Sequence, residues 1–212
     1  YNSNMAEYGI TKAGSSGNYT YSVTGALANH PVVYVSWFDA ARFANWLCNG
    51  QGNGDTETGA YSLNGAMSGI FLANAEASVY LPNENEWYKA AYYNGINSTY
   101  SAYPNGQNTI TTSDANYNGT GSKDVGSYSE DSSFYGTFDQ GGNVLEWNDT
   151  VITGGSNRVL RGGSWKYSNV GDLNAGYRNG SGGRPDVGDD WIGFRIAAVP
   201  EPSGLLTTAA LV

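Results

Sequence analysis

The sequence RGGSWKYSNVGDLNAGYR, residues 161–178, joins a strand-like run to a long polar loop. The residues that lead into it, RVLR at 158–161, have strand character, and Gly162 and Gly163 interrupt that character where the chain can bend. Beyond Trp165 the segment is rich in Asn, Gly, Ser and Tyr, which favour turns over regular structure. The stretch therefore predicts a strand that stops at a double glycine and opens into a loop with many polar side chains.

Two segments upstream of this strand share one local pattern, a short strand-like run followed by a capped helix. The N-cap residues and their capping-box partners are Ser36 with Asp39 in residues 31–48, and Asn83 with Glu86 in residues 79–94. The apolar residues at helical spacing are Ala40, Phe43, Ala44 and Leu47 in the first helix, and Trp87, Ala90 and Ala91 in the second. The sequence thus predicts two short amphipathic helices.

Two further segments complete the outline of the fold. FDQGGNVLEW, residues 138–147, has two glycines that permit tight turning and an acidic side chain near each end; taken alone, it is typical of a glycine turn that leads into a strand. WIGFRIAAV, residues 191–199, predicts a closing strand.

Composition sets the class of protein. A chain of 212 residues with 30 glycines and only 14% charged side chains predicts one loop-rich domain rather than a helix bundle. A net charge of −9 with only 10 Lys and Arg argues against binding to nucleic acid. An acidic, oxygen-rich surface suits extracellular proteins and calcium, although it could also serve solubility alone. The single cysteine, Cys48, excludes an internal disulfide.

Five motifs together carry a resemblance to a known family. They are PVVYVSWFDAARFANW, LPNENEWYKAA, FDQGGNVLEW, RVLRGGSW and IGFR, in that order between residues 31 and 199. In type and order they resemble the signatures of the formylglycine-generating enzyme, or sulfatase-modifying factor, family. The resemblance implies an α+β fold related to C-type lectins, with two short helices packed on small twisted antiparallel sheets and much irregular chain. We expect residues 31–199 to form this domain, with 1–30 as its N-terminal segment.

The resemblance also implies calcium. In FDQGGNVLEW the family's ligand positions correspond to the side chains of Asp139 and Glu146 and the backbone carbonyls of Gly142 and Val144. A second family site corresponds to Asn116 and the carbonyl of Tyr117, although the loop after it, residues 119–127, is shortened. Carboxylate and carbonyl oxygens are the ligands that calcium prefers.

The family's catalytic chemistry has no counterpart in these residues. Active members hold copper with two cysteines, and the matching positions, counted forward from Trp165, are Tyr167 and Asp172. Neither side chain supplies the soft thiolate that Cu(I) requires. Relatives of the ergothioneine type hold iron with several histidines, and this chain has only His30. We therefore expect no copper and no catalytic residues, although an oxidoreductase with an unrecognised site stays an alternative.

The favoured function is a calcium-stabilised, non-catalytic module that binds a carbohydrate or protein ligand at a cell surface. Its candidate binding loop is residues 166–190, where polar groups mix with aromatic rings as they do in antibody paratopes. The candidate ligand-binding residues are Tyr167, Asn169, Asp172, Asn174, Tyr177, Arg178, Asn179, Arg184 and Asp189. Ordinary loop composition explains the same residues about as well, and a structural surface or matrix component is a further alternative.

The end of the chain bears on location. VPEPS at residues 199–203, followed by an apolar run, resembles the start of a PEP-CTERM sorting signal, in which a short motif precedes a membrane helix and an arginine cluster. An ordinary Pro-x-Pro linker gives the same pattern. We expect residues 200–212 to begin such a tail, on an exported protein of a Gram-negative bacterium whose only membrane contact would be the missing helix. On this interpretation the chain is a fragment of a longer protein.

Overall fold

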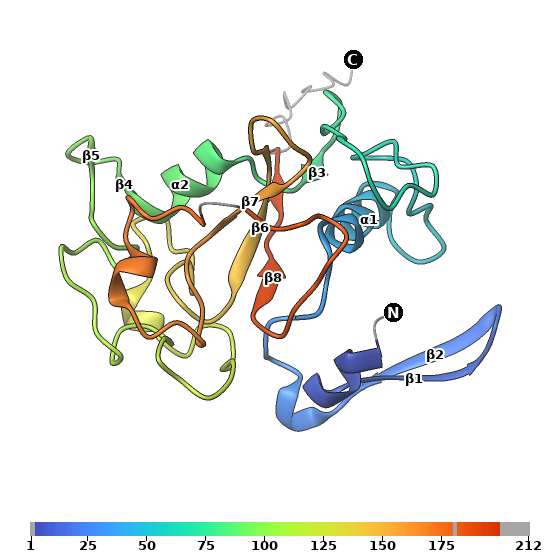
Figure 1. The fold of residues 1–212 in the computed structure, drawn as a ribbon, viewed down its shortest axis with the longest axis horizontal. Coiled ribbons are helices and arrows are strands. Elements are labelled where there is room, and N and C mark those ends of the chain that lie inside the picture. Colours follow the sequence, from blue (N-terminus) through green and yellow to red (C-terminus); the bar gives the residue numbers. More distant parts are fainter. Residues whose placement is uncertain (1–2, 180–181, 200–212) are drawn as a thin grey trace, which may run out of the picture.

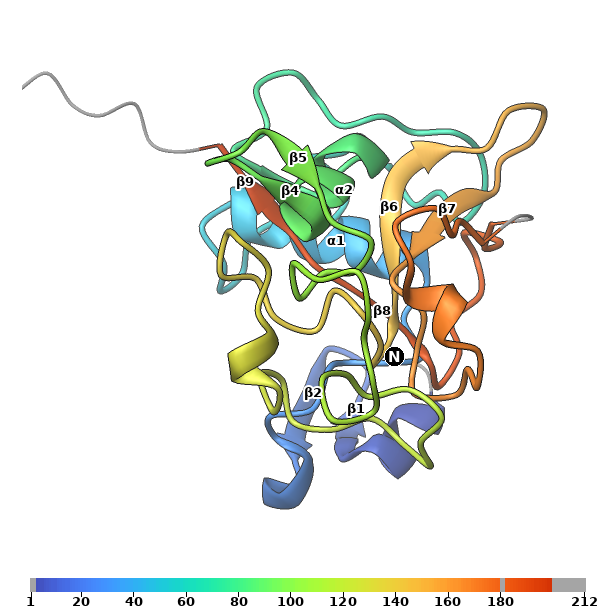
Figure 2. The same cartoon turned by 90° about the vertical axis from the view of Figure 1, so that its left-hand side faces the viewer.

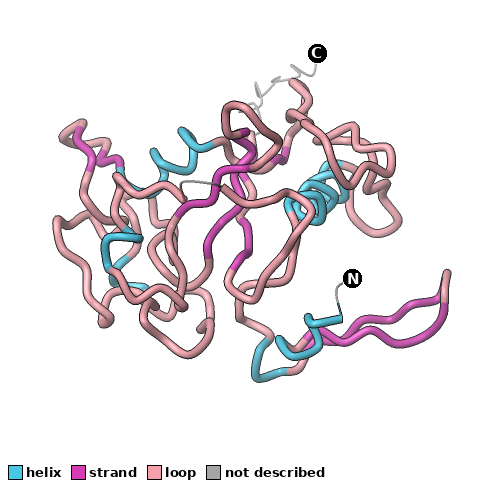
Figure 3. Tube along the Cα trace, in the orientation of Figure 1, coloured by secondary structure: helices cyan, strands magenta, loops and turns pink. Residues whose placement is uncertain are grey.

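The computed structural model describes residues 3–179 and 182–199, and irregular chain joins short elements over most of this length (Figures 1 and 3). The helices are α1 (Trp37–Cys48) and α2 (Glu84–Tyr92), with short 3-10 turns η1 (Ser3–Tyr8), η2 (Gly25–Leu27), η3 (Ser129–Asp131) and η4 (Val170–Leu173). The strands are β1 (Ile10–Ser15), β2 (Asn18–Val23), β3 (Val79–Tyr80), β4 (Tyr93–Asn94), β5 (Thr99–Tyr100), β6 (Leu145–Val151), β7 (Arg158–Arg161), β8 (Ile192–Phe194) and β9 (Ala197–Ala198). The prediction of few helices, small sheets and much irregular chain is confirmed.

The sheet at the centre of the fold has the strand order β7-β6-β8. Strand β6 pairs with β7 antiparallel, placing Glu146 opposite Arg161, and with β8 parallel, placing Leu145 opposite Ile192. The remaining pairs in the described residues, β1–β2, β3–β9 and β4–β5, are antiparallel as predicted. The parallel pair differs from the prediction because the long loop after β7 carries the chain back to the start of β6 before β8 begins.

Both predicted helix starts are confirmed. The Ser36 hydroxyl accepts the Asp39 N–H while the Asp39 carboxylate accepts the Ser36 N–H, and Asn83 and Glu86 form the equivalent capping box. The buried face of α1 is rotated from the predicted one, because Trp37 and Phe38 fill the core. Phe43, predicted to be buried, is instead 40% exposed and packs its ring edge on Phe194.

The largest core cluster lies between α1 and the central sheet. Trp37, Tyr61 and Trp147 are fully buried there, and the ring of Trp37 meets that of Tyr61 edge-on with 5.2 Å between centroids. The Trp147 indole N–H donates to the Val35 carbonyl at 3.0 Å, which ties β6 to the segment entering α1. A Cβ on Gly183 would lie 2.3 Å from the Trp147 ring, so only glycine lets the backbone pass this close.

The predicted closing strand at residues 191–199 is interrupted. It divides into β8, on the central sheet, and β9 (Figure 2), which pairs with β3, a short strand that contacts α1. Arg195 lies between the two strands and points its guanidinium at Glu146 on β6. The prediction of one continuous strand is wrong because the chain changes sheets at this arginine.

A buried ion pair connects β7 to the end of β6. Arg158 has no exposed surface; it contacts the Asp149 carboxylate at 3.2 Å and donates to the carbonyls of Asp149 and Phe71. Its guanidinium also stacks over the Trp37 ring, 3.8 Å from the centroid. Burial raises the pKa of Asp149 to about 6, although the nearby Arg158 acts to lower it.

This raised pKa gives a testable pH dependence. The Asp149 carboxyl has a pKa of about 6 in the fold and an ordinary value of 3.8, so the folded state binds the proton more tightly. Its contribution to stability is full below pH 4 and is lost as the pH rises through about 6. We expect the unfolding free energy of the wild type, measured relative to Asp149→Asn, to fall by about 2 kcal/mol between pH 4 and 7. A constant difference across this pH range would contradict the assignment.

The N-terminal hairpin, β1–β2, extends away from the rest of the molecule (Figures 1 and 2). Every side chain of β2 is exposed, including Tyr19 and Tyr21.

Within the described residues, no helix is both long and apolar enough to cross a membrane. The predicted sorting tail at residues 200–212 lies outside the described residues, and the division of the chain at residues 30 and 199 stays a prediction.

Candidate functional site

Tyr167, one of the two positions expected to correspond to the family's cysteines, lies in an aromatic cluster. Tyr167 is half-buried, and its ring meets the edges of Tyr177 and Trp191, with centroids 6.5 and 5.5 Å away. Burial raises the pKa of Tyr167, and neighbouring Tyr177 raises it further. Tyr167 therefore stays a neutral phenol at physiological pH, able to pack and to share hydrogen bonds.

Asp172 lies on η4, next to this cluster. The turn is capped by Asn169, whose side-chain oxygen accepts the Gly171 N–H at 2.9 Å. Burial raises the pKa of the Asp172 carboxyl, and its charge in turn raises the pKa values of Tyr167 and Tyr177. The structure thus brings Tyr167, Asp172 and Tyr177 together.

No cysteine pair can form here, because Cys48 is the only cysteine of the chain. It lies at the end of α1, and its thiol donates to the Val79 carbonyl at 3.1 Å. The position of Tyr167 is therefore filled by an aromatic ring with no thiol beside it. This geometry offers packing and hydrogen bonding rather than soft metal ligation.

Two of the predicted ligand-binding residues, Arg178 and Asn174, form contacts within the protein that support the loop. Arg178 pairs with Glu84 at 2.8 Å, and Arg161 pairs with the same carboxylate at 2.7 Å, which fastens the loop to the first turn of α2. Asn174 accepts the Gly176 N–H at 2.8 Å and so stabilises a turn. These residues shape the loop that presents Tyr167 and Tyr177.

Arg184 and Asp189 are not part of the Tyr167 cluster. Arg184 is exposed and pairs with Asp186 at 2.8 Å. The Asp189 carbonyl accepts the Tyr34 N–H at 2.9 Å, and its carboxylate accepts the Asp190 N–H. The nine predicted ligand-binding residues therefore do not form one surface. Arg184 and Asp189 make contacts with their own neighbours, apart from the residues around Tyr167.

The sequence did not single out two residues that complete the cluster. Trp191 packs on Tyr167, and its buried indole N–H has no partner among the described residues. Lys166 is half-exposed; its ammonium lies 5.5 Å from the Trp191 ring centroid and 3.3 Å from Asp190. One signal in the sequence could have indicated Trp191. It directly precedes the IGFR motif, and if the strand formed by that motif pairs with β6, Trp191 is brought toward residue 167.

FDQGGNVLEW, the predicted calcium segment, lines part of a cavity of about 300 Å³. Asp139, Val144 and Glu146 line it together with Arg195. Arg195 donates to both oxygens of the buried Glu146 carboxylate and to the Phe138 carbonyl at 3.0 Å. The Trp87 indole N–H donates to the same carboxylate at 2.6 Å. An internal cation therefore already neutralises Glu146.

The arrangement as it stands does not fit a calcium ion between Asp139 and Glu146. Calcium takes six to eight oxygen ligands, and here Arg195 would have to leave before Glu146 could bind one. Gly142 does not line this cavity; it packs on the Asn116 backbone, where an added Cβ would lie 2.5 Å from the carbonyl oxygen. Among the described residues, no group of three or more His, Cys, Asp or Glu side chains is placed to hold a metal ion.

The second predicted calcium segment lies against the first. Asn116 donates its amide to Asn143 Oδ1 at 3.1 Å and to the Gly121 carbonyl at 3.0 Å, and its carbonyl accepts the Asn143 N–H. Asn143 in turn bonds both the N–H and the carbonyl of Lys123. These contacts fix the loop without an ion, and calcium at Asn116 and Tyr117 stays a prediction.

The competition between calcium and Arg195 can be measured directly. Replacing Arg195 by Gln removes the cation that pairs with Glu146, so we expect added calcium, at about 5 mM, to raise the melting temperature of Arg195→Gln more than that of the wild type. Paired thermal melts in calcium and in chelator check this. A larger shift in the wild type would show that calcium binds alongside Arg195.

His30 has hydrogen-bonding partners that the sequence did not reveal. Its Nδ1 lies 2.9 Å from the Ser122 hydroxyl, and its Nε2 lies 3.4 Å from Asp124. Ser122, His30 and Asp124 are the three residue types of a catalytic triad. A triad that catalyses nucleophilic attack also needs free N–H donors to stabilise the oxyanion that develops. The neighbouring N–H groups of residues 125–127 already donate to Asn29, Asp139 and Asp124. The contacts of His30 with Ser122 and Asp124 therefore hold residue 30 against the 122–124 loop.

Comparison with known proteins identifies relatives over most of the chain. A family model described as "Sulfatase-modifying factor enzyme 1-like domain" matches residues 7–199. Among solved structures, the chain resembles Treponema denticola variable protein 1, with 25% identity and a TM-score of 0.62 over 89% of this chain and 75% of that one. It also resembles CarF, with 25% identity and a TM-score of 0.60 over 84% of this chain and 72% of that one.

Among curated proteins, the chain is 29% identical to the inactive C-alpha-formylglycine-generating enzyme 2 of Mus musculus, over 79% of this chain and 49% of that protein. It is 29% identical to the serine/threonine-protein kinase pkn1 of Chlamydia caviae, over 80% of this chain and 24% of that protein. The chain therefore spans between about a quarter and about half of the length of these curated relatives.

Proposed function

Because this chain belongs to the sulfatase-modifying factor family and has Tyr167 and Asp172 where active members have cysteines, we propose that it is a non-catalytic binding module. Formylglycine formation in the family depends on two copper-binding thiolates, and this chain has one cysteine, on α1. The name of the mouse relative, an inactive formylglycine-generating enzyme, accords with this proposal.

The observation that carries the proposal is the aromatic cluster of Tyr167, Tyr177 and Trp191. Its rings meet edge-on, and polar groups from Lys166 and Asp172 lie beside it. Aromatic anchors with a polar rim are typical of surfaces that bind glycans or proteins. The Trp191 N–H is buried beside this cluster and has no partner within the described residues.

The proposal places the module outside a bacterial cell, with a carbohydrate or protein ligand at the cell surface. Its support is the acidic composition, with 19 Asp and Glu against 10 Lys and Arg. We also propose that calcium stabilises the module. With Arg195 paired to Glu146, calcium at this segment would have to displace the guanidinium, and the melting comparison of Arg195→Gln tests this. Reading the complete gene for a signal peptide and a C-terminal membrane helix tests the location.

Ligand screening with matched variants tests the binding function. The labelled chain is applied to glycan and protein arrays, and each hit is titrated against Tyr177→Ala. We expect the affinity to fall at least about tenfold, as for an aromatic anchor at the centre of an interface. Tyr19→Ala is the matched control, since Tyr19 is 43% exposed and lies on the β1–β2 hairpin, where its ring contacts Lys12 rather than this cluster. Silent arrays would favour a structural surface component instead, and equal losses in both variants would exclude the Tyr167 cluster as the site.

A further inference from the structure

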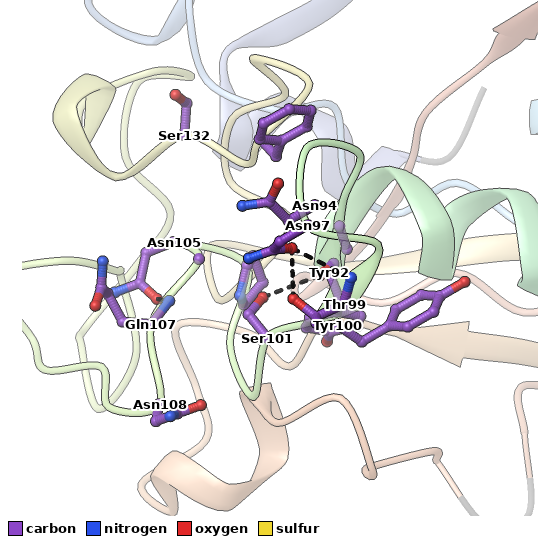
Figure 4. Close-up of a pocket in the computed structure, with 14 residues that line it drawn as sticks. Tyr92, Asn94, Asn97, Thr99, Tyr100, Ser101, Asn105, Gln107, Asn108 and Ser132 are labelled. Carbon is purple, nitrogen blue, oxygen red and sulfur yellow. Dashed lines mark hydrogen bonds between the residues drawn. The ribbon is translucent and has the colours of Figure 1, made fainter.

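A pocket of about 430 Å³ opens beside the β4–β5 hairpin (Figure 4). Its lining includes none of the Tyr167 cluster residues, Tyr167, Tyr177 and Trp191. Its walls come from the neighbouring segments 91–101 and 104–108 and from a loop distant in sequence that carries Ser132 and Phe134. None of its lining residues is Asp, Glu, Lys, Arg or His. In a chain of net charge −9, this pocket is formed by amides, hydroxyls and aromatic residues.

Two asparagines of the hairpin are held with their amide nitrogens available. Asn94 Oδ1 accepts the Ile96 N–H at 2.9 Å, and Asn97 Oδ1 accepts the Thr99 N–H at 3.2 Å and the Thr99 hydroxyl at 2.6 Å. Because these oxygens are engaged within the turn, the NH₂ group of each amide is left as a donor. Neither NH₂ group donates a hydrogen bond within the described residues, so both are free to bind a ligand oxygen.

The opposite wall presents two more amides. Asn105 holds this turn, accepting the Gln107 N–H at 3.1 Å and donating to the Thr109 carbonyl at 3.2 Å. Gln107 and Asn108 follow it, exposed, and their side chains form no hydrogen bond with the described residues. Such amides can both donate to and accept from a hydroxyl group.

An aromatic ring completes the pocket. Phe134 is 43% exposed and is held from behind by Tyr135, with 5.2 Å between ring centroids. It also packs on the backbone at Gly95, where an added Cβ would lie 3.3 Å from the ring. An exposed ring fixed beside several amides offers an apolar face for C–H groups and hydrogen bonds for hydroxyls at the same time.

We propose that this pocket binds a neutral glycan. Sugar rings without charged groups combine apolar C–H faces with hydroxyls that both donate and accept, which matches Phe134 and the four amides. Acidic glycans would find no cation among the lining residues and would be repelled by the net negative charge. This site is separate from the Tyr167 cluster, so the inference goes beyond the proposed function and can fail independently of it.

The test uses the full chain and four soluble probes. Maltotriose, cellotriose and triacetylchitotriose are the neutral glycans, and 3′-sialyllactose is the acidic comparison. Binding is followed by saturation-transfer NMR and titration for the wild type, the pocket variant Gln107→Ala/Asn108→Ala, and the matched control Gln51→Ala/Asn53→Ala. The control pair has the same residue types, is exposed, and does not line the pocket. Thermal melts confirm that all three proteins are folded.

We expect at least one neutral trisaccharide to bind the wild type, and the pocket variant to bind it about tenfold more weakly, as for the loss of two amide hydrogen bonds. The control variant should bind like the wild type. Three results would overturn the inference: no binding of any neutral probe, binding of 3′-sialyllactose alone, or binding that the pocket variant leaves unchanged. If binding is unchanged in the pocket variant but lost in Tyr177→Ala, the glycan occupies the Tyr167 cluster instead.

Discussion

Replacing Arg158 by Leu should destabilise the protein by about 3–5 kcal/mol. The guanidinium is fully buried, pairs with Asp149 at 3.2 Å and stacks 3.8 Å above the centre of the Trp37 ring. Its removal leaves the Asp149 carboxyl buried without a counter-charge and the Phe71 carbonyl without its donor. Denaturant unfolding followed by circular dichroism measures the loss.

Two further variants make this result specific. Arg184→Leu removes an arginine of an exposed pair with Asp186 and should leave stability nearly unchanged, because water screens that pair. The double replacement Arg158→Leu/Asp149→Leu should recover much of the loss, since an apolar pair needs no counter-charge. If Arg158→Leu costs no more than Arg184→Leu, the buried pair does not hold β7 to the end of β6.

Replacing Glu146 by Ala should cost about 3–4 kcal/mol of unfolding free energy. Glu146 is only 4% exposed, and its carboxylate accepts hydrogen bonds from Arg195 and Trp87, so it ties the turn between β8 and β9 to β6 and to α2. Its loss leaves the Arg195 guanidinium without its main counter-charge and the Trp87 N–H unpaired inside the fold. The same unfolding measurement applies.

Glu130→Ala is the matched control for this replacement. Glu130 is an exposed glutamate on η3, and we expect its removal to change stability by no more than about 0.5 kcal/mol. If calcium rather than Arg195 compensates Glu146, the cost of Glu146→Ala should fall sharply in chelator. An equal cost with and without calcium supports Arg195 as the internal cation.

Local features of the fold could be predicted from the sequence because their causes are local. The capping boxes at Ser36 and Asn83 depend on side chains three residues apart, and the end of β7 follows from Gly162. The absence of a cysteine pair could be read from the sequence directly, because the chain has a single cysteine. The family followed from five motifs in order, which the match over residues 7–199 confirms.

Features that join distant segments could not be predicted in this way. Arg195 and Glu146 are 49 residues apart, and Arg158 reaches a carbonyl 87 residues away, so neither contact follows from local spacing. The grouping of Tyr167 with Trp191 likewise depends on the parallel pairing of β8 with β6. Of the predicted ligand-binding residues, Arg178 is held by an ion pair with Glu84, 94 residues away, which local spacing does not reveal.

A copper assay tests the central claim, that this chain is a binding module without the family's oxidase chemistry. The purified chain is titrated with Cu(I) against the competing chelator bicinchoninate, then incubated in air with a cysteine-containing peptide. The double variant Tyr167→Cys/Asp172→Cys, which restores thiols at the family's positions, is the positive control, and Cys48→Ser controls for the lone thiol.

We predict that the wild type takes no copper from the chelator and leaves the peptide cysteine unchanged, while the double variant gains affinity for Cu(I). Tight binding of one Cu(I) by the wild type, together with conversion of the peptide cysteine to formylglycine, would contradict the account.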